Sequence, residues 1–525
     1  MIYPNNVWRW AKRHSGDLKL DRNFASIGRG LRISAQRFPD RPALIELDRL
    51  VLTYAELDRG VNRLAHYLAS RGLTKGDHVA VLSENSVEHM IALYGINRLG
   101  AVSVVLDPKW TRAEVSRALN FFDCRLLILG AALDDKVPAS GAGALDLGMV
   151  VYETTGVKCD LLEQVADCPA TEPIVAISDD ELSTIVLTSG TTGFPKGVMR
   201  SHRNIEMGCI NGVLGKAQDE NGRELAVVPL YYGSGRGSVL GQIYIGATVY
   251  IMAKFDPERV ASIIDQEQIT ALALAPTMCA RMLKVPNLER FDFRSLTSLR
   301  KAGSPFSKTM AEDVIARITP NIYQTYATTE TGCVSLLKPQ EQIPKIGSAG
   351  RLVWGVEAEL TSSEGNVLSS GEEGEIRVRS PNVCMGYYKN PELEASIIRD
   401  GWFYTGDIGR FDEDGYLYIV GRTKDLIKTG SINVAPREIE ATLLAMDGID
   451  DAAVFGVPDH EWGEAIKAII VRNPGSTVTR DEITRHCKQT LANYKVPKHL
   501  VFSDYIERNA LGKFVQPTEA VKFKT

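Results

Sequence analysis

The sequence lacks the patterns that would place it in several large classes of protein. Its 525 residues include eight cysteines, and none of them forms a C-x-x-C pair; they stand at positions 124, 159, 168, 209, 279, 333, 384 and 487. Scattered thiols exclude a disulfide framework and a structural zinc site. The eight histidines also lack metal-ligand spacing. This usage is typical of a reduced, cytoplasmic protein.

Long apolar segments and an excess of positive charge are missing as well. No window reaches the roughly 18 uninterrupted apolar residues of a transmembrane helix. The polar stretch 1–19 has no apolar core of a signal peptide. The formal net charge of −5 argues against non-specific binding of nucleic acid. We therefore expect a cytoplasmic protein with no nucleic-acid partner and no integral membrane association.

What is present is a long alternation of strand-like and helix-like segments from about residue 24 to 420. Strands are expected at the apolar, β-branched runs 78–82, 101–106, 125–129, 184–187, 247–252 and 270–275. Such runs flanked by helices predict largely parallel sheets covered on both faces. The length of the chain also exceeds one ordinary domain of about 100–200 residues.

Two later regions have a different character. Glycine-rich turns and hairpin-like alternation between about 347 and 419 predict an attached barrel or antiparallel sheet, with a tight turn at 412–416. Beyond 421–425 a compact unit follows, with strands expected at 452–455 and 468–471 and helices at 436–444 and 480–491. The predicted fold class is α/β. It comprises a large N-terminal domain (1–420) of mixed, mostly parallel sheets with a small barrel-like subdomain, a hinge (421–425), and a small mobile α+β C-terminal domain (426–525).

The run 188–197, TSGTTGFPKG, is the most informative stretch of the chain. Its three glycines allow backbone N–H groups to approach an anion, and its four hydroxyls add donors. Lys196 adds a mobile positive charge. The spacing of Gly190 and Lys196 does not fit the P-loop pattern. We expect a triphosphate-binding loop of another kind, and a solvated Gly/Ser/Thr loop is the alternative.

Four further clusters carry polar groups suited to a nucleotide, although each has a simpler explanation. Tyr326–Glu330 offers an aromatic ring, hydroxyls and a carboxylate suited to Mg²⁺, but a helix N-cap uses the same Thr and Glu. In Tyr404–Asp407 the carboxylate suits a ribose diol or an Asx turn. Gly421–Lys428 and Arg508–Lys513 supply basic groups, and a lone lysine near a terminus is usually only solvated.

In this order, the five clusters resemble the adenylate-forming superfamily of acyl-CoA synthetases, peptide-synthetase adenylation domains and beetle luciferases. The resemblance begins near Leu52–Leu57 and ends at Lys513, so it covers nearly the whole chain. It implies two half-reactions. A carboxylate attacks the α-phosphate of MgATP and releases pyrophosphate, and a thiol then displaces AMP from the acyl-adenylate.

The resemblance also implies roles for individual residues. ATP would be held by Thr188, Ser189, Gly190, Thr191, Thr192, Lys196, Gly303, Ser304, Pro305, Tyr326, Asp407 and Arg422. Tyr326 would stack on adenine, and Asp407 and Arg422 would hold the ribose. Thr329 would touch the α-phosphate, and Glu330 would bind Mg²⁺.

Two lysines and a short C-terminal segment would serve the two half-reactions. Lys513 would bridge the α-phosphate and the carboxylate in the first step, where a cation offsets developing charge. Lys424 occupies the family's hinge position. Gly430, Trp462 and Gly463 would bind coenzyme A in the second step, and a core role for Trp462 is the alternative.

The acid pocket departs from the common family pattern. Tyr232 replaces a gating histidine, and Tyr-Gly-x-Gly is similar to benzoate-type ligases, so we expect an aromatic carboxylate. The predicted substrate residues are Tyr232, Gly233, Arg236, Lys301 and Ala302. Arg236 and Lys301 favour a substrate with a second acidic group, such as a phthalate isomer, unless both are surface residues or pair with protein carboxylates.

Further departures are Ala327 and Ser431 in place of Gly, and Glu507 in place of Pro. None removes a charged catalytic group. The expected activity is ATP-dependent acid–CoA ligation, with ATP, Mg²⁺ and coenzyme A as cofactors or co-substrates, and a homodimer is left open. The alternatives are a medium-chain fatty acid–CoA ligase, a stand-alone enzyme that loads a carrier protein, an oxidising luciferase and a silent binding protein of the same fold.

Overall fold

The computed structural model describes residues 27–137, 145–154, 159–188, 195–301, 306, 308–423, 425–429, 432–460, 463–508 and 514. Its α-helices are α2 (Ile27–Arg37), α3 (Tyr54–Ser70), α4 (Val87–Arg98), α5 (Arg112–Phe121), α6 (Asp160–Gln164), α7 (His202–Leu214), α8 (Gly233–Ile245), α9 (Pro257–Glu267), α10 (Pro276–Leu283), α11 (Lys308–Arg317), α12 (Pro391–Ile397), α13 (Pro436–Leu444) and α14 (Arg480–Thr490). Short 3-10 helices are η1 (Ala131–Lys136), η2 (Leu288–Arg290), η3 (Pro339–Glu341) and η4 (Asn493–Lys495).

A seven-stranded sheet is built mostly from the first half of the chain. Its strand order is β18-β8-β7-β4-β3-β5-β6. These strands are β3 (His78–Leu82), β4 (Val102–Val105), β5 (Cys124–Gly130), β6 (Met149–Tyr152), β7 (Leu182–Thr188), β8 (Lys196–Ser201) and β18 (Gly386–Tyr387). The strands β7, β4, β3, β5 and β6 are parallel neighbours, and β8 is antiparallel to both β7 and β18.

A nine-stranded sheet runs in the order β15-β14-β13-β12-β11-β9-β10-β1-β2. Its strands are β1 (Pro42–Glu46), β2 (Leu50–Thr53), β9 (Arg223–Ala226), β10 (Thr248–Ile251), β11 (Ala271–Leu274), β12 (Ser298–Lys301), β13 (Ile322–Thr328), β14 (Gly332–Leu337) and β15 (Arg351–Leu352). The central pairings are parallel, and β2, β14 and β15 join antiparallel at the two ends.

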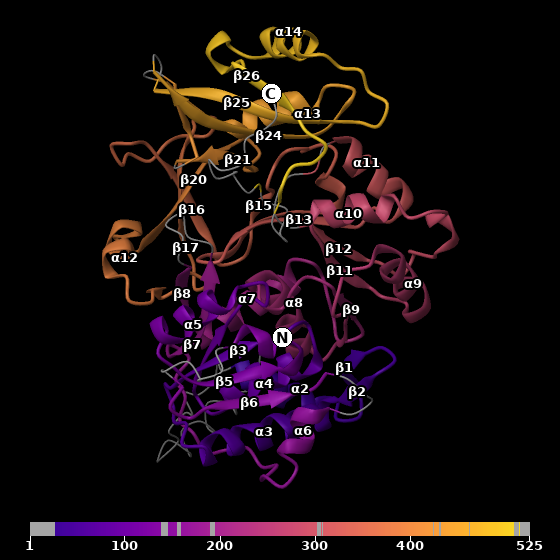
Figure 1. Ribbon diagram of the computed structural model, residues 1–525, viewed down its shortest axis with the longest axis vertical. Helices are drawn as coiled ribbons and strands as arrows, with labels where there is room; N and C mark the ends of the chain where they lie inside the picture. The colour runs from indigo at the N-terminus through magenta and orange to yellow at the C-terminus, as the bar shows by residue number, and fades with distance from the viewer. Residues whose placement is uncertain are drawn as a thin grey trace, which may run out of the picture.

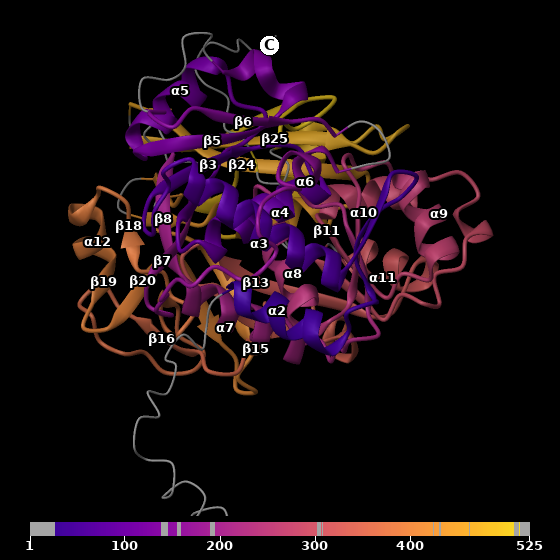
Figure 2. The same ribbon diagram turned by 90° about the horizontal axis from the view of Figure 1, so that it is seen from below.

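The two sheets and their helices form alternating layers. One core joins residues of β3 and β5 to residues of β1 and β10 through α2, α3, α4 and α8, which therefore lie between the sheets. The outer face of the seven-stranded sheet packs on α5, and the outer face of the nine-stranded sheet packs on α9, α10 and α11. Figure 2 shows α9–α11 on one side of the molecule and α12 with β19 and β20 on the other. The predicted α/β class is confirmed.

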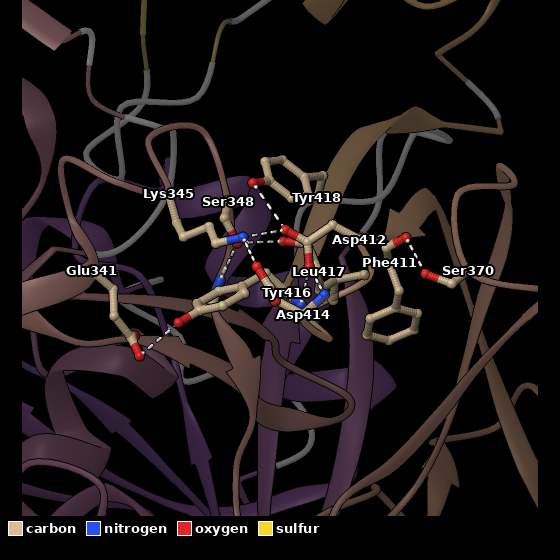
Figure 3. Close-up of polar contacts among 11 residues, drawn as sticks. Glu341, Lys345, Ser348, Ser370, Phe411, Asp412, Asp414, Tyr416, Leu417 and Tyr418 are labelled. Carbon is tan, nitrogen blue, oxygen red and sulfur yellow. Dashed lines mark hydrogen bonds and ion pairs between the residues drawn. The ribbon is translucent and has the colours of Figure 1, made fainter.

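The predicted barrel-like region is a five-stranded antiparallel sheet in the order β16-β17-β20-β19, with β21 also paired to β20. Its strands are β16 (Glu357–Thr361), β17 (Gly374–Arg379), β19 (Ile398–Arg399), β20 (Trp402–Phe411) and β21 (Leu417–Arg422). The β20–β21 turn is tied to the loop that follows β14. Lys345 Nζ donates to Asp412 Oδ2 at 2.9 Å, Tyr416 donates to Glu341, and Ser348 donates to Leu417 O (Figure 3).

The C-terminal elements form a separate sheet with the order β23-β22-β25-β24 and β26 parallel to β25. They are β22 (Ile427–Thr429), β23 (Ile432–Val434), β24 (Ile449–Asp459), β25 (Gly463–Arg472) and β26 (His499–Phe502), with a core of their own against α13 and α14. Figure 1 places them at one end of the molecule, opposite α2, α3 and α6. Strand β21 continues to Arg422, two residues beyond the predicted domain boundary at 420, because Asp407 and Arg422 pair in register.

Local sequence signals explain where many helices begin. α3, α5 and α14 start with a threonine and a glutamate three residues later, and both partners of each capping box are formed. Proline occupies the first turn of α9, α10, α12 and α13, where its missing N–H costs nothing. Within the described ranges, no helix combines the length and the apolar character needed to cross a bilayer.

Candidate functional site

A buried carboxylate, Asp407, organises one side of the site between the nine-stranded and five-stranded sheets. Its Oδ2 accepts from the Tyr326 hydroxyl at 2.6 Å, and its Oδ1 accepts from Arg422 Nε at 2.7 Å. Both donors are side chains distant in the sequence, whereas an Asx turn would use the backbone N–H two residues after Asp407. Burial, followed by the Asp407 charge, raises the pKa of Tyr326. Burial disfavours the Arg422 cation, but Asp407 outweighs it and the pKa of Arg422 is raised.

Thr329 and Glu330 lie in the turn between β13 and β14, not at the start of a helix. Thr328 pairs with Gly332 across the hairpin, so the two residues stand at its tip. Arg200 Nη1 donates to Thr329 O at 2.7 Å, and Cys384 N donates to Glu330 O at 2.7 Å. Both contacts hold the backbone of the tip. The helix N-cap alternative for this pair is therefore excluded.

The Glu330 carboxylate is oriented by one tyrosine. Tyr387 donates its hydroxyl to Glu330 Oε1 at 2.7 Å, and burial together with Glu330 raises the pKa of Tyr387. Lys196 Nζ lies over the same ring, 5.7 Å from its centroid. A cation and a carboxylate thus flank one aromatic ring. This donor set fits Mg²⁺, which commonly takes a single protein carboxylate plus phosphate oxygens.

The hairpin of β7 and β8 brings Thr188 and Lys196 opposite each other. They are paired in register, and Thr188 Oγ1 lies 3.5 Å from Lys196 O. The predicted ATP residues Ser189, Gly190, Thr191 and Thr192 lie outside the described residues, as do Gly303, Ser304 and Pro305. The hairpin adjoins the start of α8, since a Cβ on Gly233 would lie 3.8 Å from Val186 Cγ1.

Two tyrosines stand at the start of α8, where the acid pocket is predicted. Tyr232 is the N-cap residue of the helix, and its ring centroid lies 4.6 Å from that of Tyr231. The helix approaches the preceding loop closely, because a Cβ on Gly235 would sit 2.3 Å from Pro229 O. Burial raises the pKa of Tyr232 to about 12. Both rings are therefore neutral, largely apolar surfaces at physiological pH.

Arg236 lies one turn into α8 and is only 4% exposed. Its Nη1 donates to Leu230 O at 3.4 Å, and no described carboxylate forms an ion pair with it. Burial, then repulsion from Arg200, lowers the pKa of Arg236 to about 10. His89 of α4 is also buried, and neither of its ring nitrogens has a partner within the described part of the chain. Arg236 is thus a buried cation without a counter-ion among the described residues.

Lys301 ends β12 and is 1% exposed. Its ammonium donates to the Gln324 side-chain oxygen at 2.9 Å and lies 5.1 Å from the centroid of the Phe306 ring. Burial lowers the pKa of Lys301 to about 7, and repulsion from Arg437 of α13 contributes. Neither Arg236 nor Lys301 is a surface residue, and neither pairs with a described carboxylate. The neighbouring Ala302 lies outside the described residues.

The segment predicted for coenzyme A lies in the C-terminal sheet. Gly463 begins β25 with a φ of +76°, a conformation that favours glycine, and it pairs with Thr429. Lys428 N donates to Glu464 at 2.6 Å beside this pair. Gly430, Trp462 and the hinge lysine Lys424 lie outside the described residues.

Lys513 also lies outside the described residues, but both sides of its segment are anchored. Arg508 and Phe514 form an isolated antiparallel bridge. Arg508 pairs with Asp451 at 2.7 Å, and Phe514 lies against Phe455 with ring centroids 5.6 Å apart. The chain around Lys513 is therefore attached to the start and middle of β24.

Sequence reasoning missed several residues that support the site. Gln324 stands two positions before Tyr326 on β13, so the period of two along a strand places both side chains on one face. This alternation could have predicted that Gln324 faces the site, where it accepts a hydrogen bond from Lys301. Tyr387 and Arg200 gave no such signal, because their contacts join segments that are 57 and 129 residues apart.

Comparison with known proteins agrees with this architecture. Residues 31–388 match the family model of the AMP-binding enzyme, and residues 438–513 match the AMP-binding enzyme C-terminal domain. The chain is 34% identical over 488 residues to 2-succinylbenzoate–CoA ligase of Bacillus licheniformis, covering 93% of this chain and 98% of that protein. It is 34% identical to feruloyl-CoA synthase of an Amycolatopsis species, covering 89% and 92%.

A solved structure supports the same conclusion. The o-succinylbenzoate CoA synthetase of Bacillus subtilis in complex with ATP and magnesium superposes with a TM-score of 0.80 at 29% identity, covering 92% of this chain and 98% of that one. The resemblance seen in the motifs is confirmed. The chain belongs to the AMP-binding enzyme family, within the adenylate-forming superfamily.

Proposed function

We propose that this protein activates an aromatic carboxylic acid with ATP and transfers the acyl group to coenzyme A. The enzyme class, an AMP-forming acyl-CoA synthetase, follows from its family. The observation that carries the aromatic acid is the pair Tyr231 and Tyr232 at the start of α8, beside the glycines of its first two turns. Flat rings and missing side chains suit a planar substrate. Relatives named for 2-succinylbenzoate and ferulate support this choice.

Two balanced steps describe the proposed reaction. A carboxylate oxygen attacks the α-phosphorus of ATP, the bond to the pyrophosphate oxygen breaks, and an acyl-adenylate forms. The sulfur of coenzyme A then attacks the acyl carbon, and AMP leaves. Glu330 is proposed to hold Mg²⁺, which offsets phosphate charge, and Asp407 and Arg422 to hold the ribose. Tyr326 and Thr329 keep the roles proposed from the sequence, and Lys196 is proposed to contact the β- and γ-phosphates.

Lys513 is proposed to act only in the first step. Lys513→Ala should then abolish adenylate formation, measured as exchange of labelled pyrophosphate into ATP. Formation of thioester from supplied acyl-adenylate should continue. An equal loss of both reactions would contradict the assignment. Lys424 as the hinge, and Gly430, Trp462 and Gly463 as coenzyme A contacts, remain proposals beside it.

Buried cations favour a substrate with a second acidic group. Arg236 has no described counter-ion, and the only hydrogen bond from the Lys301 ammonium to a described side chain goes to an amide oxygen. An unpaired buried cation is costly, so an incoming anion would offset it. If Arg236 contacts that second acidic group, Arg236→Leu should lower the preference for aromatic dicarboxylates over monocarboxylates by about tenfold. An unchanged ranking would remove Arg236 from the acid pocket.

Assay of a panel of aromatic, dicarboxylic and medium-chain fatty acids for AMP release with coenzyme A tests the proposal. Preference for fatty acids would favour the medium-chain alternative. Adenylate formation without transfer to free coenzyme A would favour an enzyme that loads a carrier protein. The homodimer and the cytoplasmic location stay predictions, to be checked by sedimentation and by cell fractionation.

A further inference from the structure

A second polar cluster lies under α8. Its members, here called the distal cluster, are Lys216 just beyond α7, Glu224 on β9, Ser238 on α8 and Arg300 on β12. Ser238 Oγ and Arg300 Nη2 both donate to Glu224 Oε1, and Arg300 Nη2 also contacts Ser238 Oγ. Glu224 is only 1% exposed. Three polar side chains are therefore joined by hydrogen bonds between α8 and the nine-stranded sheet, and Lys216 lies close enough for the charges of Arg300 and Glu224 to act on it.

The distal cluster carries one positive charge more than it can balance. Lys216 and Arg300 are cations, and Glu224 is the single carboxylate among the four. Lys216 donates to Gly212 O at 2.8 Å, and no ion pair of Lys216 is found in the described ranges. Burial, followed by repulsion from Arg300, lowers the pKa of Lys216 to about 8. An unbalanced cation in a site with little water favours an anionic partner.

Hydrogen bonding around the distal cluster is also incomplete. Glu224 Oε2 and Arg300 Nε are buried without a partner among the described residues. Ser298 Oγ is also buried without a partner among the described residues. In the sheet, Ala271 of β11 pairs with Ser298 of β12 on one side and with Glu224 of β9 on the other. Most buried polar atoms in proteins have a partner. Buried charged groups with unsatisfied hydrogen bonds are more typical of a ligand-binding site than of a protein core.

Glycines on α7 and α8 leave unfilled positions, one of them next to Lys216. The two helices are antiparallel neighbours, since Gly241 packs against Cys209 and Tyr244 donates to Glu206. One turn before Gly241, a Cβ on Gly237 would have no described heavy atom within 4 Å. A Cβ on Gly212 would meet only Lys216 Nζ, at 3.7 Å. The missing side chains leave room beside the ammonium, and Lys216 and Ser238 are only half-buried.

We propose that the distal cluster, rather than Arg236, binds the second acidic group of the substrate, at the end opposite the carboxylate that is activated. This rests on the proposed function and narrows its substrate class. Ser238 lies five residues beyond Gly233, about 7.5 Å along the helix at a rise of about 1.5 Å per residue. Arg236 lies about 200° around the helix from Ser238, so the two cationic regions contact different parts of a ligand. A para diacid suits this spacing better than an ortho diacid.

The test compares terephthalate with 4-methylbenzoate, which has the same ring and a neutral para group. Lys216→Gln should lower kcat/KM for terephthalate by about tenfold to 100-fold, the loss expected for one charged hydrogen bond. It should leave 4-methylbenzoate within about twofold. Lys216→Arg keeps the charge and should retain most of the terephthalate activity. Lys284→Gln, an exposed lysine beyond α10, is the matched control and should change neither substrate.

Three outcomes would overturn the proposal. Wild-type enzyme that uses 4-methylbenzoate but no diacid would refute it while leaving the proposed function intact. Equal losses for both substrates in Lys216→Gln would show a purely structural role. A change of diacid preference in Arg236→Leu but none in Lys216→Gln would move the second acidic group to Arg236. Failure of every aromatic acid to support pyrophosphate exchange would instead refute the proposed function.

Substitutions of Gly237 test whether the unfilled space beside this glycine accepts substrate, and they leave the charges of the distal cluster unchanged. Alanine and valine fit a helix better than glycine, so Gly237→Ala and Gly237→Val should fold at least as well as wild type. The added methyl groups enter the open region and should raise KM for para-substituted acids more than for benzoate. An unchanged ratio of the two KM values would place the substrate elsewhere.

Discussion

The proposed ribose side of the site, around Asp407, and the proposed acid side, around α8, differ in how their charges are paired. Around Asp407 every charge has a protein partner, because both carboxylate oxygens are engaged by Tyr326 and Arg422. Around α8, Arg236 is buried and Lys216 is half-buried, and within the part of the chain that the structure describes both cations donate only to backbone carbonyls. Lys301 faces an amide oxygen.

This difference fits the ligand that is proposed for each side. A ribose is neutral, so its pocket must hold its own charges in place before the ligand arrives. An acid substrate carries a negative charge, so an unpaired cation in its pocket is neutralised only when the substrate binds. Burial disfavours the charged form of these side chains and lowers the pKa of Arg236 to about 10, of Lys216 to about 8 and of Lys301 to about 7.

The largest effect on activity is expected at Glu330, the proposed magnesium ligand. Glu330→Gln keeps the shape of the side chain but removes the charge that is proposed to hold Mg²⁺. Pyrophosphate exchange should fall by roughly 100-fold or more, as for loss of one transition-state contact. Tyr387→Phe removes only the hydroxyl that orients Glu330 and should cost less than about tenfold. Equal effects of the two variants would mean that Glu330 is merely structural.

The ribose side is expected to lose stability when its charge balance is broken. Asp407→Asn removes the hydrogen-bonded, buried counter-ion of Arg422 and should cost about 2 kcal/mol of unfolding free energy, less than for a fully buried pair because Arg422 is partly exposed. Urea denaturation measures this loss, and titration calorimetry should show weaker ATP binding. Asp425→Asn, an exposed carboxylate near the same arginine, is the control and should be close to neutral. If Asp407→Asn were as stable as wild type, the pairing of charges around Asp407 would not contribute to stability, and the proposed difference between the two sides would be wrong.

The smallest effect is a pH dependence on the acid side. The folded-state pKa of Lys301 is about 7, below its ordinary 10.5, so between these values the unfolded chain binds a proton that the folded chain does not. Stability therefore rises with pH in this window, by at most about 1.4 kcal/mol per pH unit. Lys301→Met should remove this slope in urea denaturation at rising pH. Parallel curves for wild type and Lys301→Met would contradict the buried charge, and Lys284→Met serves as the exposed control.

The local elements of the fold were predictable from the sequence, but their assembly was not. The apolar runs 78–82 and 184–187 are strands β3 and β7, and the helix expected at 436–444 has the same bounds as α13 because Pro436 sets its start. Nothing local indicates that β1 and β2 join the nine-stranded sheet. β1 pairs with β10, about two hundred residues later, through a register decided by tertiary packing.

The candidate site divides in the same way. Asp407, Arg422 and Glu330 were predicted because short motifs carry them, and the structure adds the contact between Asp407 and Arg422 and the hydrogen bond from Tyr387 to Glu330. The distal cluster was invisible, since Lys216, Glu224 and Arg300 belong to no motif and meet only when α7, β9 and β12 pack together. Buried polar pairs of this kind depend on long-range geometry, which periodicity does not encode.

Lys301 is sensitive to the C-terminal sheet as well as to its own surroundings. Arg437, at the start of α13, lies close enough to disfavour the ammonium charge. If α13 moved away, that repulsion would fall and the proton affinity of Lys301 would increase. By linkage, such a movement near neutral pH would take up a fraction of a proton from the solvent. A pH indicator in weakly buffered solution would then register the position of α13.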